Sequence, residues 1–348
     1  MLKLNKIHNI DALNGLKALQ DESIDCVVTS PPYFQLRDYG VDGQIGLEST
    51  PQEFVQKLVD IFHEAKRVLK KSGTLWIVIG DTYNGTSAGT KTGNKETYHD
   101  YSFRENINSI ARKSLLMIPA RLAIAMIDDG WTLRNKIIWH KPNAMPSSVN
   151  DRFTVDYEEV LFFTKAKQYY FKQLKEPMVT VNLYEANKGI QLTRKYSREV
   201  SELPNPNKVV RGSVAAFGPA QSGNRKQDSV GRNDYTGFNA RYQTADDLQR
   251  NKRTVWSIPT SQSSIEHFAM FPEDLIEPMI ESGCPKDGIV LDMFSGSGTT
   301  CAVAKRMGRG YIGFDINPEY SAVANNRVSK EFYQSTLEDF GGDEECSP

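Results

Sequence analysis

Cysteine is scarce in this 348-residue sequence, and the four that occur are far apart: Cys26, Cys284, Cys301 and Cys346. None forms a CxxC pair, so we expect neither a disulfide framework nor a zinc site. Cys26 and Cys301 lie within apolar runs, which is typical of small buried residues. A reducing cytoplasm is the setting that this usage favours.

Long hydrophobic runs are missing as well. No apolar stretch reaches the roughly 18–20 residues that cross a bilayer, and residues 1–16 lack a signal-peptide pattern. Hydrophobic residues make up 39% and charged residues 24% of the chain, as in soluble globular proteins. We therefore expect no membrane association, and the length suits one large α/β domain with an insertion.

The net charge is only −1, but it is unevenly distributed. Residues 166–255 hold sixteen Lys and Arg against eight Asp and Glu, together with nine aromatic residues. The rest of the chain holds 26 basic and 35 acidic residues. A basic middle inside an acidic body indicates a surface for a polyanion, although an ordinary solvated surface explains the charge equally well.

Hydrophobic periodicity predicts regular structure at both ends of the chain. Thr50 is a candidate N-cap for a helix, Glu53 completes a capping box, and Gly73 is expected to end that helix. Residues 82–109 are polar and without periodicity, which predicts a long mobile loop. The predicted strands cover 24–29, 73–81, 132–142 and 157–165; the predicted helices cover 50–73, 118–130 and 271–283; and 288–328 reads as a βαβ unit with a further helix.

A glycine-rich turn, "VLDMFSGSGTT", joins a predicted strand to a predicted helix. No lysine follows Gly298, which excludes a P-loop, and Cys301 stands where a dinucleotide fingerprint has Gly or Ala. Asp315 ends the next strand, seventeen residues beyond Gly298, where an acid suits a ribose diol. The turn therefore indicates a nucleoside cofactor, and a purely structural turn with a helix-capping aspartate is the alternative.

The stretch "TSPPY" ends the first predicted strand. Proline donates no backbone hydrogen bond and holds the preceding residue extended, so Pro31 and Pro32 would leave rigid free carbonyls at this point. For an isolated Pro-Pro, a stiff turn is the simplest interpretation.

Together the two motifs resemble the amino-group DNA methyltransferases that use S-adenosyl-L-methionine. TSPPY (29–33) comes first, DMFSGSGTT (292–300) comes late, and the basic insert lies between them. This order resembles the beta group of that family. The resemblance covers most of 20–165 and 260–330 and implies an α/β fold: a Rossmann-like methyltransferase sheet with permuted motif order and an inserted target recognition region.

The domains implied are a catalytic half over 1–165, a target recognition insert over 166–255, a cofactor-binding half over 256–330 and an acidic tail over 331–348. The residues that match the family's catalytic tetrapeptide are Ser30, Pro31, Pro32 and Tyr33. The residues that match its cofactor-binding segments are Asp292, Phe294, Gly296, Gly298, Thr299, Asp315 and Phe268, with Asp81 at the edge of the cleft.

The residue types suit this chemistry. An exocyclic amino group is a poor nucleophile, and acceptors at Ser30 and at the carbonyl of Pro31 would take its two hydrogens. Tyr33 would offer a face to a base rotated out of the duplex. A sulfonium methyl is already activated, so no metal is expected. Methylation at cytosine C5 would need a Pro-Cys nucleophile, and the only match, Cys284–Pro285, has the reverse order.

The expected partner is double-stranded DNA, with or without a cognate restriction endonuclease, and the chain is expected to act as a monomer or homodimer in a prokaryotic or phage-encoded setting. Arg37 has two interpretations, a phosphate contact or an ion pair with Asp38. The insert residues expected to contact DNA are Arg194, Lys195, Arg211, Arg225, Lys226, Arg232 and Arg241.

The serine of Ser-Pro-Pro-Tyr favours cytosine N4 within the family, where aspartate is commoner in adenine-N6 enzymes, and adenine N6 stays open. RNA or protein methyltransferases with Pro-Pro-Tyr are a more remote alternative, because they usually carry the glycine motif first. A catalytically silent DNA-binding module would not need Ser30, Tyr33 and the glycine turn together.

Overall fold

The computed structural model describes residues 2–85, 107–177, 249–260 and 271–332. The chain divides into two compact units. The first combines Met1–Leu174 with Arg253–Pro348, and the second is Lys175–Lys252. Both predicted methyltransferase halves thus fall in the first unit.

The described residues of the first unit form one eight-stranded sheet with the order β1-β10-β9-β2-β3-β5-β4-β8. β5 runs antiparallel to both of its neighbours, and the remaining strand pairs are parallel. In sheet order the strands are Lys6–Asn9, Gly310–Asp315, Ile289–Asp292, Ile24–Thr29, Leu69–Ile79, Tyr157–Thr164, Thr132–His140 and Val255–Ser257.

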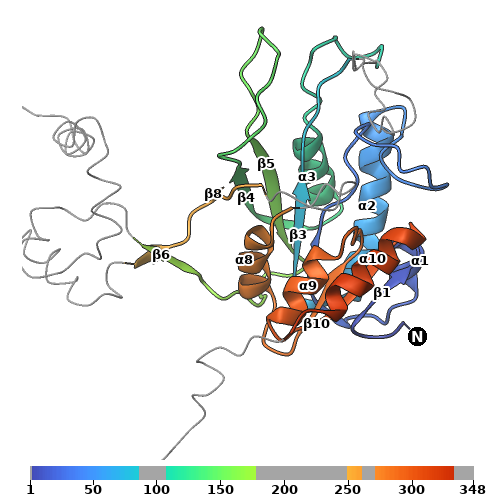
Figure 1. Cartoon of the computed structure of the whole chain (residues 1–348), viewed down its shortest axis with the longest axis vertical. Coiled ribbons are helices and arrows are strands. Elements are labelled where there is room, and N and C mark those ends of the chain that lie inside the picture. Colours follow the sequence, from blue (N-terminus) through green and yellow to red (C-terminus); the bar gives the residue numbers. More distant parts are fainter. Residues whose placement is uncertain (1, 86–106, 178–248, 261–270, 333–348) are drawn as a thin grey trace, which may run out of the picture. The chain divides into compact units, whose positions relative to one another are not determined.

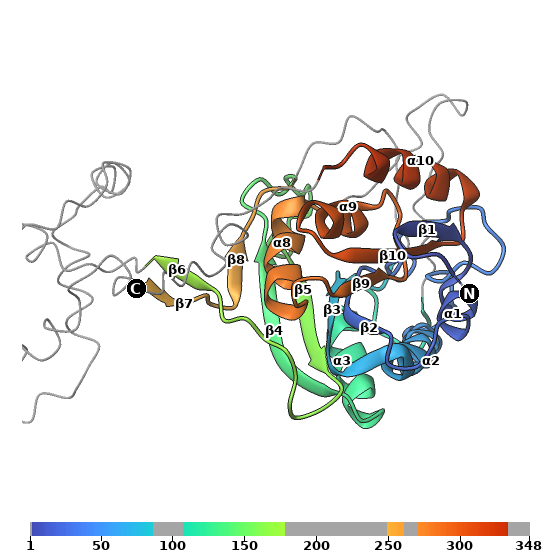
Figure 2. The same cartoon turned by 90° about the horizontal axis from the view of Figure 1, so that it is seen from below.

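Helices cover both faces of this sheet (Figures 1 and 2). One face carries α1 (Ala12–Lys17), α2 (Pro51–Val68) and α3 (Ile118–Asp128). The other carries α8 (Glu273–Gly283), α9 (Thr299–Arg306) and α10 (Pro318–Ser329). Each layer has its own buried cluster, and β2 is buried at all six positions because it contributes to both.

The chain reverses its winding between β9 and β2. From β9 it passes through α9 to β10, and from β2 it passes in the opposite direction, through α2, to β3. Open α/β sheets bind ligands at such a switch point, outside the carboxyl ends of the strands. Because β2 and β9 come from opposite ends of the sequence, both ends of the chain are needed to build that position.

The predicted helix over 50–73 is too long, and its end at Gly73 is wrong. Thr50 does cap the helix, since its hydroxyl accepts a hydrogen bond from the amide of Glu53 at 3.2 Å. The helix nevertheless stops at Val68, and β3 begins at Leu69, four residues before the predicted strand. Buried Leu69 pairs with Ile24, so strand pairing overrides the helical propensity of these residues.

The predicted insert boundary also differs from the division of the chain. Residues before Lys175 belong to the first unit: the amide of Tyr170 donates to the carbonyl of Ser72 at 2.8 Å, and Phe171 stacks on Phe162. In the second unit, the described residues form a short antiparallel ribbon of β6 (Lys175–Pro177) and β7 (Gln249–Asn251).

The sequence patterns missed several short elements: β1, α1, β8 and the ribbon. β1 exists through pairing with β10, since the amide of Asn5 donates to the carbonyl of Tyr311 at 2.7 Å across more than 300 residues of sequence. A four-residue strand of this kind carries too little periodicity to be recognised by itself.

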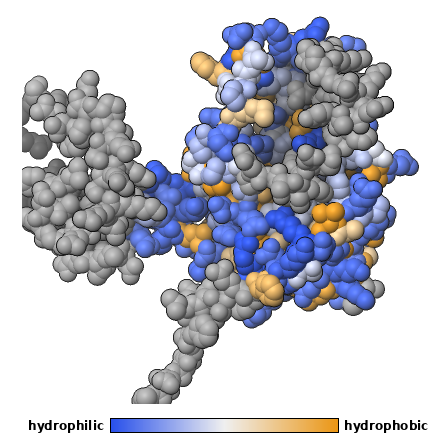
Figure 3. All heavy atoms as spheres, viewed as in Figure 1, coloured by the Kyte–Doolittle hydropathy of each residue, from blue (hydrophilic) through white to orange (hydrophobic). Residues whose placement is uncertain are grey.

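The described surface is largely hydrophilic in the view of Figure 3, where hydrophobic residues form separate small spots. No helix in the described ranges combines the length and apolarity that a membrane crossing requires. Within the same ranges, no group of three or more His, Cys, Asp and Glu is arranged to hold a metal ion.

Candidate active site

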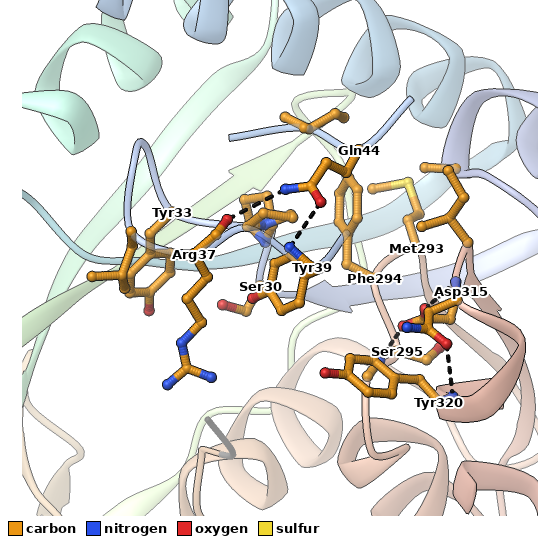
Figure 4. A pocket seen from close by; sticks show the side chains of 18 of the residues that line it. Ser30, Tyr33, Arg37, Tyr39, Gln44, Met293, Phe294, Ser295, Asp315 and Tyr320 are labelled. Carbon is orange, nitrogen blue, oxygen red and sulfur yellow. Dashed lines mark hydrogen bonds between the residues drawn. The ribbon is translucent and has the colours of Figure 1, made fainter. Parts of the chain in front are cut away.

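A cavity of about 670 Å³ opens at the carboxyl ends of β2, β9 and β10. Residues 30–33 line it from the end of β2, residues 293–297 line it from the end of β9, and Asp315 lines it from the end of β10. The two sequence motifs, more than 250 residues apart, therefore face one space (Figure 4).

Tyr33 is held at its hydroxyl by a residue of strand β5. Its hydroxyl donates a hydrogen bond of 2.6 Å to Oε2 of Glu158 on β5. Burial, followed by the adjacent carboxylate of Glu158, raises the pKa of Tyr33 well above its usual range, while the nearby Ser30 hydroxyl opposes the shift. The phenol therefore stays neutral and remains a donor.

A glycine makes room for the Tyr33 ring. A Cβ atom built on Gly80, just after β3, would lie 2.6 Å from Cε2 of Tyr33. Real Cβ atoms essentially never approach another atom so closely. The ring thus packs against bare backbone on one side and is held at its hydroxyl by Glu158.

Glu158 also forms an ion pair with Lys141, whose Nζ lies 4.3 Å from the centre of the Trp139 ring. Lys141, Glu158 and Trp139 all line the cavity, and the side chains of the first two are less than one-fifth exposed. From the sequence, Glu158 is expected to help align the sheet cleft, and its place in the lining agrees with this expectation. Trp139 is buried, as a packing residue would be, and it donates from Nε1 to the carbonyl of Ile258.

The two glycines of the turn have different neighbours. Gly296 has φ +48°, and a Cβ there would meet no atom of the described residues within 4 Å, so its backbone faces the cavity. Gly298 has φ +79°, and a Cβ there would lie 3.0 Å from Cβ of Ala324 and 3.1 Å from Cδ1 of Ile7. Gly296 therefore allows a ligand to approach, whereas Gly298 allows α10 and β1 to pack closely.

Asp315 joins the glycine turn to the start of α10. Its Oδ2 accepts the amide of Gly296 and its Oδ1 accepts the amide of Asn317, both at 2.8 Å. Burial raises the pKa of this carboxyl to about 6, against the lowering effect of the two amides. Asp315 lines the cavity, and each oxygen has acceptor capacity beyond its one amide donor, which fits the paired hydroxyls of a ribose.

Asp292 lies deeper and does not line the cavity. Its Oδ1 accepts hydrogen bonds from the hydroxyl of Thr29 at 2.6 Å and from the amide of Phe294 at 3.1 Å. Its buried Oδ2 has no hydrogen-bond partner among the described residues. Burial raises its pKa to about 6. Asp292 therefore ties β9 to β2 and holds the start of the glycine turn.

Asp81 is also outside the cavity lining. Its Oδ1 accepts the amide of Ile118 at 3.0 Å and that of Thr82 at 2.8 Å, which caps α3, a helix whose own N-cap residue, Met117, has no capping side chain. Burial raises the pKa of Asp81. Its position favours a structural role over contact with a cofactor.

Phe294 and Thr299 do line the cavity. The Thr299 hydroxyl accepts a hydrogen bond of 3.0 Å from Arg327, which is itself paired with Glu273 on α8. These contacts hold the first residue of α9 in place.

Several predicted site residues lie outside the described residues, as do most of the predicted loop 82–109 and most of the acidic tail. They are Phe268 and the predicted DNA-binding residues Arg194, Lys195, Arg211, Arg225, Lys226, Arg232 and Arg241.

The described cysteines are buried and free, and none of them lines the cavity. Burial raises the pKa of Cys26 to about 12 and raises that of Cys284 and Cys301 as well. A thiol with so high a pKa is a poor nucleophile, so these residues do not favour covalent catalysis.

Several lining residues carried no signal in the sequence: Tyr39, Gln44, Lys141, Tyr320 and Asp11. Tyr39 meets Tyr320 edge-to-face, with ring centres 6.2 Å apart, so the segment after the tetrapeptide contacts α10. Asp11 caps α1 by accepting the amide of Asn14. Only its position immediately before "ALNGL" could have indicated a helix start there.

The chain is similar to known proteins in sequence and in fold. A family model described as DNA methylase, for N6 and N4 methylation, matches residues 24–326. The Type II methyltransferase M.Cfr9I of Citrobacter freundii is 38% identical over 92% of this chain and 86% of its own length.

Two solved structures share the fold. A Thermus thermophilus protein named as a DNA modification methylase, in complex with S-adenosyl-L-methionine, has a TM-score of 0.53 at 21% identity, covering 95% of this chain and 99% of its own. The PvuII DNA methyltransferase, named as cytosine-N4-specific, has a TM-score of 0.53 at 20% identity, covering 92% and 87%. The predicted Rossmann-like fold is confirmed.

Proposed function

Because the chain belongs to the N6/N4 DNA methylase family, we propose that it transfers a methyl group from S-adenosyl-L-methionine to the N4 amino group of a cytosine at a specific site in duplex DNA. The observation that carries this proposal is the shared cavity, which the Ser-Pro-Pro-Tyr segment and the glycine turn line from neighbouring strands. A methyl donor and a flipped base can therefore meet there.

The cofactor half of the cavity fits a nucleoside. Asp315 would hold the ribose hydroxyls, and the open backbone at Gly296 leaves space for the ligand to lie against the turn. Phe294 supplies an apolar wall. When bound, the cofactor supplies a methyl group on a cationic sulfonium, which needs no further activation by the protein.

The substrate half would polarise and orient the amino group. The hydroxyl of Ser30 and the carbonyl of Pro31 would accept its two hydrogens, which localises the nitrogen lone pair. Tyr33 would stack on the flipped base, with its ring plane set by Gly80 and Glu158. The side chains present thus act by placement and hydrogen bonding.

Cytosine is proposed over adenine because serine, rather than aspartate, precedes the two prolines, as in most cytosine-N4 enzymes that the tetrapeptide resembles. The proposal is tested by incubating the purified protein with genomic DNA and S-adenosyl-L-methionine, digesting the DNA to nucleosides and separating them by mass. N4-methylcytosine is expected. N6-methyladenine would move the assignment to the alternative base, and unmodified DNA would refute DNA methylation.

Sequence recognition is proposed to reside in the second unit, whose sequence carries most of the basic excess. Positive side chains there would contact phosphates, and a subset would read base edges. The relative of Citrobacter freundii is a Type II methyltransferase, which supports a role beside a restriction endonuclease in a prokaryotic cytoplasm. Mapping the methylated bases by sequencing would give the recognition site directly.

A further inference from the structure

Arg37 follows the tetrapeptide by four residues, and its side chain lines the cavity. Figure 4 shows the guanidinium on the side of Ser30 and Tyr33, away from Asp315. Arg37 therefore faces the half of the cavity assigned to the base rather than the half assigned to the nucleoside cofactor.

The backbone that carries Arg37 is braced by Gln44. The Gln44 Oε1 atom accepts the amide of Tyr39 at 2.8 Å, and its Nε2 donates to the carbonyl of Arg37 at 3.3 Å. The Tyr39 ring in turn packs against Tyr320 on α10. Arg37 is thus presented from a supported segment, which lowers the entropy that it would lose on binding a ligand.

The ion pair between Arg37 and Asp38 that the sequence allowed does not form. Asp38 instead accepts the amide of Gly40 at 2.8 Å. Within the described ranges, the Arg37 guanidinium has no ion-pair partner. Of the described cations that line the cavity, Lys57 is paired with Glu48 and Lys141 with Glu158, so among these residues the charge of Arg37 is left for a ligand.

We propose that Arg37 binds a backbone phosphate of the nucleotide whose base enters the cavity. Rotating a base out of the duplex moves its flanking phosphates, and a guanidinium can hold two phosphate oxygens at once in a fixed geometry. The other oxyanion within reach of such a cavity is the carboxylate of the cofactor, which the placement of Arg37 disfavours. This inference rests on the proposed function and adds one positioning contact to it.

The test combines protein variants with a chemical change in the DNA. Duplexes that contain the mapped site carry either natural phosphates or one neutral methylphosphonate beside the target nucleotide. Single-turnover methylation is measured for the wild type, Arg37→Met, Arg37→Lys and a matched surface control, Lys113→Met, whose side chain is 82% exposed.

For the wild type, we expect one methylphosphonate position to slow methyl transfer at subsaturating enzyme by roughly tenfold or more. Arg37→Met should show a similar loss on natural DNA and no further loss at that position. Arg37→Lys should retain part of the rate, and Lys113→Met should match the wild type. The slope of log affinity for DNA against log salt concentration should fall by about one in Arg37→Met.

The contact would be overturned if every methylphosphonate slowed methyl transfer by the same factor in Arg37→Met as in the wild type. So would a weaker affinity of Arg37→Met for S-adenosylhomocysteine without DNA, since that result assigns the residue to the cofactor carboxylate. If the wild type methylates no natural duplex, the proposed function itself fails, and the phosphate contact fails with it.

Discussion

The hydroxyl of Thr29 donates a hydrogen bond of 2.6 Å to the buried carboxylate of Asp292, and this contact joins two strands that lie 263 residues apart in sequence. Thr29 immediately precedes Ser-Pro-Pro-Tyr, and Asp292 is the last residue of β9, within the glycine-rich turn motif. This one hydrogen bond therefore helps to set the distance between the two segments that we propose bind the base and the cofactor.

Thr29→Val should destabilise the protein by about 1–3 kcal/mol at pH 8, because the ionised Asp292 loses its side-chain donor. Burial raises the folded pKa of Asp292 from 3.8 to about 6, so the carboxylate is ionised in the fold above that pH and neutral below it. The loss should therefore shrink toward pH 5. Urea unfolding at both pH values measures it, with Thr29→Ser as the control that keeps the hydroxyl.

Cofactor affinity should depend on the ionisation of Asp315. Its folded pKa of about 6 lies above the ordinary 3.8, and ribose hydroxyls donate best to the ionised form. Affinity for S-adenosylhomocysteine should thus be constant above about pH 7 and fall by up to about tenfold per pH unit below 6. Calorimetry across pH 5–8 tests this, and Asp315→Asn should be weak throughout. An unchanged affinity in Asp315→Asn would mean that Asp315 holds the glycine turn through its hydrogen bonds and does not bind the cofactor.

Gly80→Ala should impair methyl transfer without impairing cofactor binding. The new methyl group would lie 2.6 Å from the Tyr33 ring, so the ring must leave its position. We expect single-turnover methylation to fall by roughly tenfold or more. Gly310→Ala is the matched control, since its nearest contact would be an ordinary 3.4 Å. Equal rates in both variants would mean that the ring position is unimportant.

The Tyr33 hydroxyl has a structural partner that the sequence could not indicate. From the sequence, Tyr33→Phe is expected to keep most activity, because the face of the ring is used for stacking. The hydrogen bond to Glu158 adds a positioning role, so we expect Tyr33→Phe to lose several-fold in rate and Tyr33→Ala about 1–3 kcal/mol of stacking. In a double-mutant cycle, Glu158→Gln should cost less in the Tyr33→Phe background. Additive effects would show that the two residues act separately.

Residues 178–248 should be removable as one piece. The β6–β7 ribbon pairs Lys175 with Asn251 and Pro177 with Gln249, so the two ends of the segment are already adjacent. Replacing 178–248 with a two-residue Asn-Gly turn should leave binding of S-adenosylhomocysteine intact and abolish site-specific DNA binding. A gel-shift comparison of cognate and scrambled duplexes measures this, and retained specificity would place recognition elsewhere.

The motifs that could be predicted from the sequence are local. A strand followed by Ser-Pro-Pro-Tyr, and a strand followed by Gly-x-Gly, are recognisable because the turn chemistry lies within a few residues. Lys141 and Gln44 could not be found this way, because each is identified by its contacts in the fold: Lys141 pairs with Glu158, and Gln44 bonds to the backbone of Arg37 and Tyr39. The predicted helix end at Gly73 was wrong for a similar reason, because the pairing of β3 with β2 determines where the helix stops.

The side chain of Asn84 connects two segments that lie more than 20 residues apart in the sequence. Its side-chain amide donates to the carbonyls of Ile107 and Ile110 at 3.0 and 2.7 Å, and its oxygen accepts the amide of Ile107 at 2.9 Å. The connection between 85 and 107 is therefore anchored independently of its own length, and lengthening it adds only about 0.6 kcal/mol per doubling. One side chain therefore carries three of the hydrogen bonds that hold the two ends of this connection together.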